Sequence, residues 1–114
     1  MLKVIIWGLG KGYNQIFNLI KYYETLEEIN VIGVFSDDSF ISQDGYKVYE
    51  KKDISKLEYD YCIVTIQNFK SILDEAISLG IERQKIIPAR VLTVPNFNFK
   101  NYDRIKKNGI SIIA

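Results

Sequence analysis

The amino-acid sequence predicts an α/β fold, doubly wound around a mostly parallel sheet of four to five strands. Three observations support this fold class. Short apolar runs rich in β-branched residues alternate along the chain with amphipathic stretches of helical spacing. A glycine-rich turn follows the first apolar run and opens the first helix. The chain has 114 residues, of which 47% are hydrophobic, and this is enough for one domain with its own core.

The first half of the chain is expected to contain two main strands, with one helix between them along the sequence. Val4, Ile5 and Ile6 are consecutive and apolar, as is typical of a strand that is buried on both faces. A helical period of apolar residues follows, and a second apolar run ends in polar residues. The elements expected here are a strand over Lys3–Trp7, a helix over Gly12–Tyr23, a strand over Asn30–Phe35, a short strand over Tyr46–Tyr49 and a brief helix capped by Asp53.

The second half of the chain repeats the strand–helix–strand pattern. Asn68 is a suitable N-cap for the second main helix, and Gly80 ends that helix. The elements expected here are a strand over Tyr61–Ile66, a helix over Phe69–Leu79, a strand over Lys85–Ile87, helical turns over Asn101–Lys107 and a last strand over Ile110–Ala114. Because the sequence stops inside an apolar strand, we expect residues 96–114 to be a linker and the start of a following domain.

The order of the elements predicts where a ligand would bind. Right-handed crossovers place the second main strand on one side of the first strand and the Tyr61 strand on the other side. A topological switch point then opens at the carboxyl ends of the first and third main strands. Ligands of open α/β sheets bind in that crevice.

The composition leaves few catalytic groups. The chain has no histidine, which excludes His-based triads, His general bases and His metal ligands. Cys62 is the single cysteine and lies among apolar residues of an expected strand, so we expect a buried, unreactive thiol in a cytoplasmic protein. The net charge of +1 does not indicate nucleic-acid binding, and the sequence contains neither a membrane-spanning run nor a signal peptide. We therefore expect no catalytic residue and no metal site in this chain.

The strongest motif is the turn WGLGKGY at residues 7–13, which lies between a buried strand and a helix. Glycines allow a sharp turn and a close approach of a ligand, and the helix N-terminus favours an anion. Its candidate ligand-binding residues are Gly8, Gly10, Lys11 and Gly12. The spacing is G-x-G-x-G, so Tyr13 stands where the dinucleotide motif has its third glycine. The alternative interpretation is a tight strand-to-helix turn that binds no ligand.

Polar residues follow the other two main strands at the same edge of the expected sheet. Asp37 and Asp38 end the second strand, where a carboxylate can accept hydrogen bonds from a ribose. Thr65 and Gln67 end the third strand and are candidates to contact a base or a sugar. The two aspartates have a simpler interpretation as turn residues, and Asn68, which follows Gln67, has one as a helix cap.

With these motifs, the chain resembles the Rossmann-like domain at the front of many bacterial sugar-modifying and polysaccharide-biosynthesis proteins. That group includes the sugar-nucleotide-binding N-terminal domain of enzymes of the sialic-acid O-acetyltransferase and bacillosamine acetyltransferase type. The likeness spans roughly residues 3–88. The shared motifs are VIIWGLG at residues 4–10, IGVFSDD at residues 32–38, a loop with Gly45 and Val48, and YDYCIVTI at residues 59–66.

The resemblance implies a sugar-nucleotide site at the glycine turn and at the acid after the second strand, which are Gly8, Gly10 and Asp37 here. The acetyltransferase activity is not implied, because the turn lacks that family's histidine and no hexapeptide repeats follow. The tail over residues 97–113 is similar to the junction into an uncharacterised domain of capsule and exopolysaccharide biosynthesis proteins.

We therefore expect residues 1–95 to form a Rossmann-like domain that binds a nucleotide. The candidate ligands are a UDP- or dTDP-sugar and NAD(P), and the domain would be a non-catalytic part of a larger transferase-type enzyme, with a homo-oligomer as one arrangement. One alternative is a fragment of an S-adenosylmethionine-dependent methyltransferase, whose glycine spacing is the same, although Ile6 stands where that family has an acid. The other alternative is a structural or dimerisation module with a vestigial site.

Overall fold

The computed structural model describes residues 1–8, 10–36, 42–43, 45–65, 69–95 and 97–102. Its six strands form one sheet in the order β3-β4-β2-β1-β5-β6. The elements are β1 (Leu2–Trp7), α1 (Lys11–Thr25), β2 (Ile29–Phe35), β3 (Ser42–Gln43), β4 (Tyr46–Tyr49), β5 (Tyr61–Val64), α2 (Phe69–Ser78) and β6 (Ile86–Pro88), with 3-10 helices η1 (Lys51–Lys56), η2 (Arg83–Lys85) and η3 (Ala89–Thr93).

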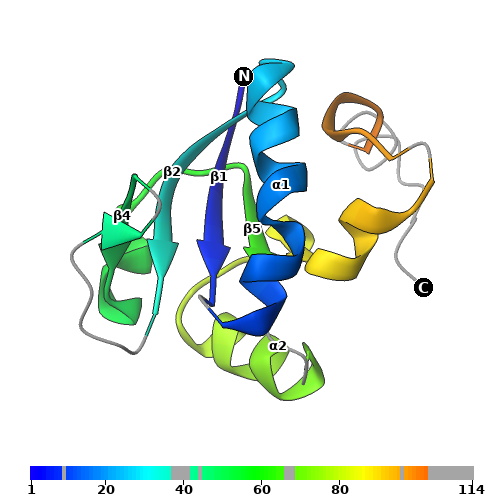
Figure 1. Cartoon of the computed structure of the whole chain (residues 1–114). Helices are drawn as coiled ribbons and strands as arrows, with labels where there is room; N and C mark the ends of the chain where they lie inside the picture. Colours follow the sequence, from blue (N-terminus) through cyan, green and yellow to red (C-terminus); the bar gives the residue numbers. More distant parts are fainter. Residues whose placement is uncertain (9, 37–41, 44, 66–68, 96, 103–114) are drawn as a thin grey trace.

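Five of the strands run parallel, and only the two-residue β3 pairs antiparallel at one edge. β1 lies at the centre, with β2 on one side and β5 on the other, as Figure 1 shows. This is the arrangement that right-handed crossovers predict. The predicted fold class, a doubly wound and mostly parallel α/β sheet of the Rossmann-like kind, is confirmed.

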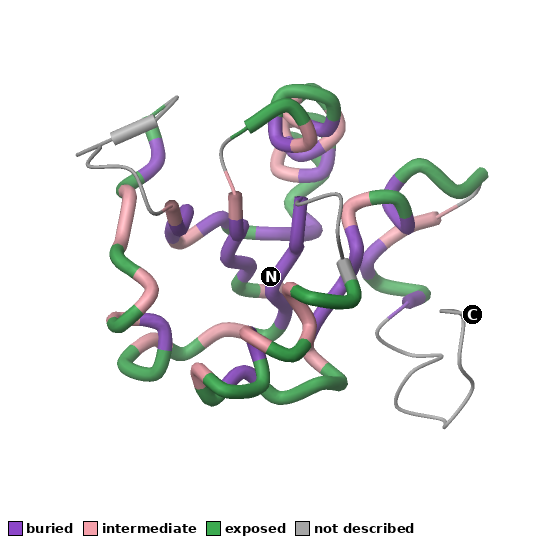
Figure 2. The backbone as a smooth tube through the Cα atoms, turned by 90° about the horizontal axis from the view of Figure 1, so that it is seen from below, coloured by how far each residue is buried: buried purple, intermediate pink, exposed green. Residues whose placement is uncertain are grey.

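Side chains of β1 alternate between two hydrophobic clusters, one on each face of the sheet. Val4 and Ile6 pack on the side of α1, while Ile5 and Trp7 pack on the side of η1 and α2. All four are at most 1% exposed. The tube in Figure 2 shows the buried strands at the centre, between mostly exposed or half-buried connecting segments. Burial on both faces explains why this strand is a continuous apolar run.

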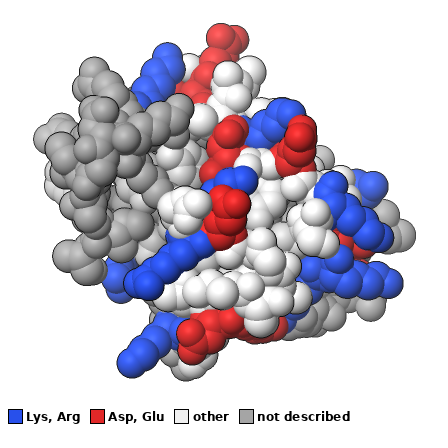
Figure 3. All heavy atoms as spheres, turned by 180° about the vertical axis from the view of Figure 1, so that it is seen from behind, with Lys and Arg blue, Asp and Glu red and all other residues white. Residues whose placement is uncertain are grey.

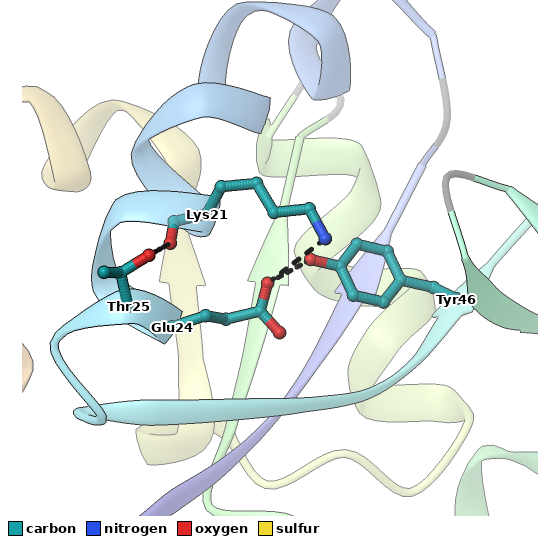
Figure 4. Close-up of polar contacts among 4 residues, drawn as sticks. All are labelled: Lys21, Glu24, Thr25 and Tyr46. Atoms are coloured by element: carbon teal, nitrogen blue, oxygen red, sulfur yellow. Dashed lines mark hydrogen bonds and ion pairs between the residues drawn. The ribbon is translucent and has the colours of Figure 1, made fainter.

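A polar contact fixes the strand β4 to α1 (Figure 4). The Tyr46 hydroxyl donates a hydrogen bond to the Glu24 carboxylate, and the Lys21 ammonium lies 4.4 Å from the centroid of the Tyr46 ring. Lys21 also pairs with Glu24 at 3.6 Å, and the Thr25 hydroxyl donates to the Lys21 carbonyl at 2.9 Å. These contacts lie in the second half of α1, so they anchor the helix at the end away from the glycine turn.

The segment after η3 belongs to the same core as the sheet. Phe99 is fully buried and Tyr102 is 2% exposed, and both lie in the cluster on the α1 side. The rings of Tyr23 and Phe99 meet edge to face, with centroids 5.0 Å apart. The backbone N–H of Phe99 donates to the Glu28 carboxylate at 3.0 Å, and the Tyr23 hydroxyl donates to the Phe97 carbonyl at 3.1 Å.

This packing bears on the expected boundary after residue 95, which falls inside a cluster that continues to Tyr102. The helical turn expected from Asn101 begins earlier, at residue 99, because the Glu28 carboxylate accepts the first N–H of that turn. The last strand, expected over Ile110–Ala114, lies outside the described residues. Whether another domain follows stays a prediction.

Three short elements were not expected from the sequence, and the last strand is shifted by one residue from its expected place over Lys85–Ile87. β3 has two residues, η2 has three and η3 has five, which is too short for a period to show. β6 includes Pro88, which lacks an N–H but is tolerated because β6 is an edge strand paired only with β5. Among the described residues, none of the helices has the length and apolar character to cross a membrane.

Candidate functional site

The glycine turn joins β1 to α1 at the carboxyl edge of the sheet, next to β5. Gly8 has a φ of 108°, a conformation that favours glycine, and its N–H donates to the Phe35 carbonyl of β2 at 2.9 Å. Gly10 is the N-cap of α1, and its carbonyl accepts a hydrogen bond from the Asn14 N–H at 3.2 Å. The turn therefore starts α1 directly at the switch point between β1 and β5.

Gly12 provides the close contact between helix and strand that the third glycine makes in the dinucleotide-binding motif. A Cβ on Gly12 would lie 2.0 Å from the Thr65 carbonyl oxygen, so only glycine fits between α1 and the end of β5. Tyr13 instead turns into the core on the α1 side and is 1% exposed. The close approach of helix to strand is therefore kept without a glycine at residue 13, because α1 meets the sheet one residue earlier, at Gly12.

Thr65 holds the turn from the other side. Its N–H donates to the Trp7 carbonyl at 3.0 Å, and its hydroxyl lies 3.0 Å from the carbonyl oxygens of both Trp7 and Gly8. Thr65 is 7% exposed. A hydroxyl has one hydrogen to donate, and here both of its acceptors belong to the turn. Thr65 was predicted to contact a base or a sugar, and the contacts observed for its hydroxyl position the backbone of the turn.

The N-terminus of α1 is open to an anion. Among the residues that the structure describes, no side chain caps this helix end and no acidic residue lies in its first turn. Lys11 is exposed at the first helical position. An added Cβ at Gly10 would meet nothing within 4 Å. The first N–H groups of a helix have no acceptor within the helix, and together with the helix dipole they give this end a partial positive charge, which suits a phosphate.

The structure brings together five of the eight residues that the sequence proposed for the site. They are Gly8, Gly10, Lys11, Gly12 and Thr65, which lie in the turn and directly beside it. Asp37, Asp38 and Gln67 lie outside the described residues, and their contact with a ligand stays a prediction.

Lys51 is a cation at the same edge of the sheet that was not predicted from the sequence as a site residue. The Lys51 ammonium, in η1, lies 5.3 Å from the centroid of the Trp7 ring and 2.6 Å from the carboxylate of Glu75 in α2. The only available signal was its place two residues after β4, whose carboxyl end lies at the edge where ligands bind. Elsewhere on this side of the molecule, opposite α1, basic and acidic side chains are interspersed (Figure 3).

Cys62 is buried in β5, as the sequence analysis predicted. Its side chain is fully enclosed, and burial raises the pKa of its thiol to about 12. A thiol in that environment is not a nucleophile near neutral pH. Within the described ranges, no three carboxylate or thiol groups come together in a way that could hold a metal ion.

The comparisons with known proteins identify a family. A family model described as C2185-like, N-terminal matches residues 1–87 of this chain. The match runs from the start of β1 to Ile87 in β6 and includes the glycine turn, Thr65 and Lys51. No curated protein matches the sequence. Because the family model covers more than half of the chain, the chain belongs to the C2185-like N-terminal domain family.

Proposed function

We propose that this domain binds the diphosphate group of a nucleotide at the glycine turn, with a UDP-sugar, a dTDP-sugar or NAD(P) as the ligand. The observation that carries the proposal is the N-terminus of α1, which lies uncapped by the described side chains at the switch point of the sheet. Gly10 precedes it with open space beside its Cα. A diphosphate would accept hydrogen bonds from the first N–H groups of α1 and gain from the helix dipole.

The geometry of the turn favours a phosphate over a neutral group. Its backbone is held in place by Gly8, Gly12 and Thr65, so the N–H groups of the helix end are oriented before any ligand arrives. Lys11 adds a positive charge at the first helical position. A pre-organised site loses little conformational entropy on binding, and this raises its affinity.

We further propose that the domain serves a bacterial surface-polysaccharide biosynthesis protein in the cytoplasm. This step rests on the likeness of the motifs at residues 4–10, 32–38 and 59–66 to sugar-nucleotide-binding domains of such proteins. The domain would hold the nucleotide while a catalytic partner, such as the rest of a transferase, acts on it. This division fits a chain without histidine whose thiol is buried.

Two variants of Gly10 test the proposal with little risk to the fold. Gly10→Asp and Gly10→Asn both place a side chain in open space and both can cap α1, which favours its stability. Only Asp adds a negative charge at the position proposed for the diphosphate. We expect Gly10→Asp to abolish nucleotide binding and Gly10→Asn to weaken it much less, with both variants as stable as the wild type.

Thermal unfolding with UDP-N-acetylglucosamine, dTDP-glucose, NAD⁺, NADP⁺ and S-adenosylmethionine is the measurement. A ligand at 100 times its Kd adds about 2.7 kcal/mol of stability, which raises the Tm of a domain of this size by about 10 °C. If no ligand shifts the wild-type Tm, the proposal is refuted in favour of a structural module. A shift with S-adenosylmethionine alone supports the methyltransferase alternative, and an equal shift in wild type and Gly10→Asp excludes the glycine turn as the site.

A further inference from the structure

The ion pair between Lys51 and Glu75 joins two segments at the edge of the candidate site. Lys51 lies in η1, which follows the carboxyl end of β4, and Glu75 lies in α2, which follows β5. Their charged atoms are 2.6 Å apart, and the ammonium lies over the ring of Trp7. Trp7 is the last residue of β1 and precedes Gly8, so the ring that this cation contacts belongs to the residue from which the glycine turn starts.

The two partners of this ion pair differ in their access to water. The Lys51 side chain is 21% exposed, and its ammonium lies over the Trp7 ring. The Glu75 side chain is 40% exposed, so its carboxylate can move into solvent by a change of rotamer. If an anion with more charge than a carboxylate approaches, Glu75 is therefore the partner that leaves, while the ammonium stays beside the indole.

We propose that Lys51 is a second anion-binding group of the nucleotide site, and that Glu75 occupies it until the ligand's diphosphate takes the place of the carboxylate. The inference rests on the proposed function, which supplies the diphosphate. It adds a cation on the α2 face of β1 to the helix dipole on the α1 face. A diphosphate carries two negative charges and outcompetes a single carboxylate for the ammonium.

This exchange makes a prediction that a purely structural ion pair does not. Lys51→Met removes the cation, and Glu75→Gln removes the carboxylate charge that competes with the diphosphate for that cation. The two variants should therefore change nucleotide affinity in opposite directions. Both variants lose the same ion pair, so a structural role would move their stability, and any indirect effect on binding, in the same direction. Lys52→Met and Glu50→Gln are matched controls, because that neighbouring pair has the same charges at 3.1 Å but is more than 70% exposed.

The experiment is calorimetric titration of UDP-N-acetylglucosamine, dTDP-glucose and NAD⁺ into the wild type and the four variants. For the nucleotide that binds, we expect Lys51→Met to weaken affinity by about ten-fold or more, as for a lost charge-assisted hydrogen bond. Glu75→Gln should tighten binding by about three-fold, and both controls should stay within about two-fold of the wild type. Binding should also change the fluorescence of Trp7, the single tryptophan of the chain.

The outcomes separate this inference from the proposed function. If the wild type binds a nucleotide but Glu75→Gln binds it no more tightly, the exchange is refuted and the nucleotide site stands. The same holds if Lys51→Met weakens binding no more than Lys52→Met does. If the wild type binds none of the three nucleotides, the proposed function and the exchange are both refuted. Opposite effects of the two variants, with silent controls, establish Lys51 as part of the site.

Discussion

Replacement of Gly12 by alanine tests how closely α1 approaches the end of β5. The added Cβ would lie 2.0 Å from the Thr65 carbonyl oxygen and 3.0 Å from the carbonyl carbon. Ordinary contact begins near 3.4 Å, so helix and strand must separate by about 1.4 Å. The Thr65 carbonyl oxygen and carbon belong to the backbone, so the clash cannot be relieved by a flexible side chain that moves aside. The separation would also loosen the packing of Tyr13 and Ile16 on the same helix.

Two opposing effects set the size of the change. Alanine is favoured over glycine inside a helix by about 1 kcal/mol. Overpacking of a tight contact costs about 1–3 kcal/mol, and a clash between two backbones lies at the upper end or beyond it. We therefore expect Gly12→Ala to lower the free energy of unfolding by about 2 kcal/mol. Gly10→Ser is the matched control, because its side chain meets nothing within 4 Å and serine is a good N-cap.

Urea unfolding followed by the fluorescence of Trp7 measures this change, because Trp7 is 1% exposed and directly precedes the turn. For a domain of this size, a loss of about 2 kcal/mol lowers the urea midpoint by about 1 M. Gly10→Ser should unfold at the wild-type midpoint. A midpoint for Gly12→Ala at or above that of the wild type would refute the close approach of α1 to Thr65, and with it the account of the third glycine.

Two further predictions concern the core and the buried thiol. Phe99→Ala should destabilise the domain by about 3–5 kcal/mol, because the ring is fully buried. Glu28→Gln should destabilise it by about 1 kcal/mol, because it replaces a charge-assisted hydrogen bond to the Phe99 N–H. Urea midpoints measure both changes, and midpoints within error of the wild type would place residues 97–102 outside the core. Burial raises the pKa of the Cys62 thiol from 9.0 to about 12, so the unfolded chain ionises first and stability should fall as the pH rises from 9 toward 12. The urea midpoint at pH 8 and pH 10 measures this loss of stability, and the midpoint of Cys62→Ala should fall less between the two pH values. An equal fall in the wild type and Cys62→Ala would assign the effect to other groups such as Tyr59, whose pKa is also raised to about 12 by burial.

The main strands and their order could be predicted because they depend on local pattern and on chain handedness. The consecutive apolar residues Val4, Ile5 and Ile6 indicated a strand buried on both faces, and the structure encloses all three. The crossover rule then placed β2 and β5 on either side of β1. These inferences need no knowledge of which side chains touch across the fold.

The features that the sequence did not predict depend on contacts between distant residues. Phe99 lies in the range expected to be a linker, and no local pattern indicated that it packs on Tyr23 and hydrogen-bonds to Glu28, which is 71 residues away in sequence. Lys51 was overlooked for the same reason, since its partners Trp7 and Glu75 are brought to it by the sheet. Such pairings follow from the tertiary structure, and no local pattern indicates them.

The role of the third glycine shows why a motif's spacing is weaker information than its geometry. Compared with G-x-G-x-x-G, this turn has lost a glycine at Tyr13, which argued against a standard phosphate-binding turn. In the structure, Gly12 makes the close contact with Thr65, and the Thr65 hydroxyl in turn contacts the carbonyl oxygens of Trp7 and Gly8. Thr65 therefore joins the end of β1, the turn and the start of α1. Because these contacts are made within the chain, a ligand does not have to order the turn, and binding should leave its backbone unchanged.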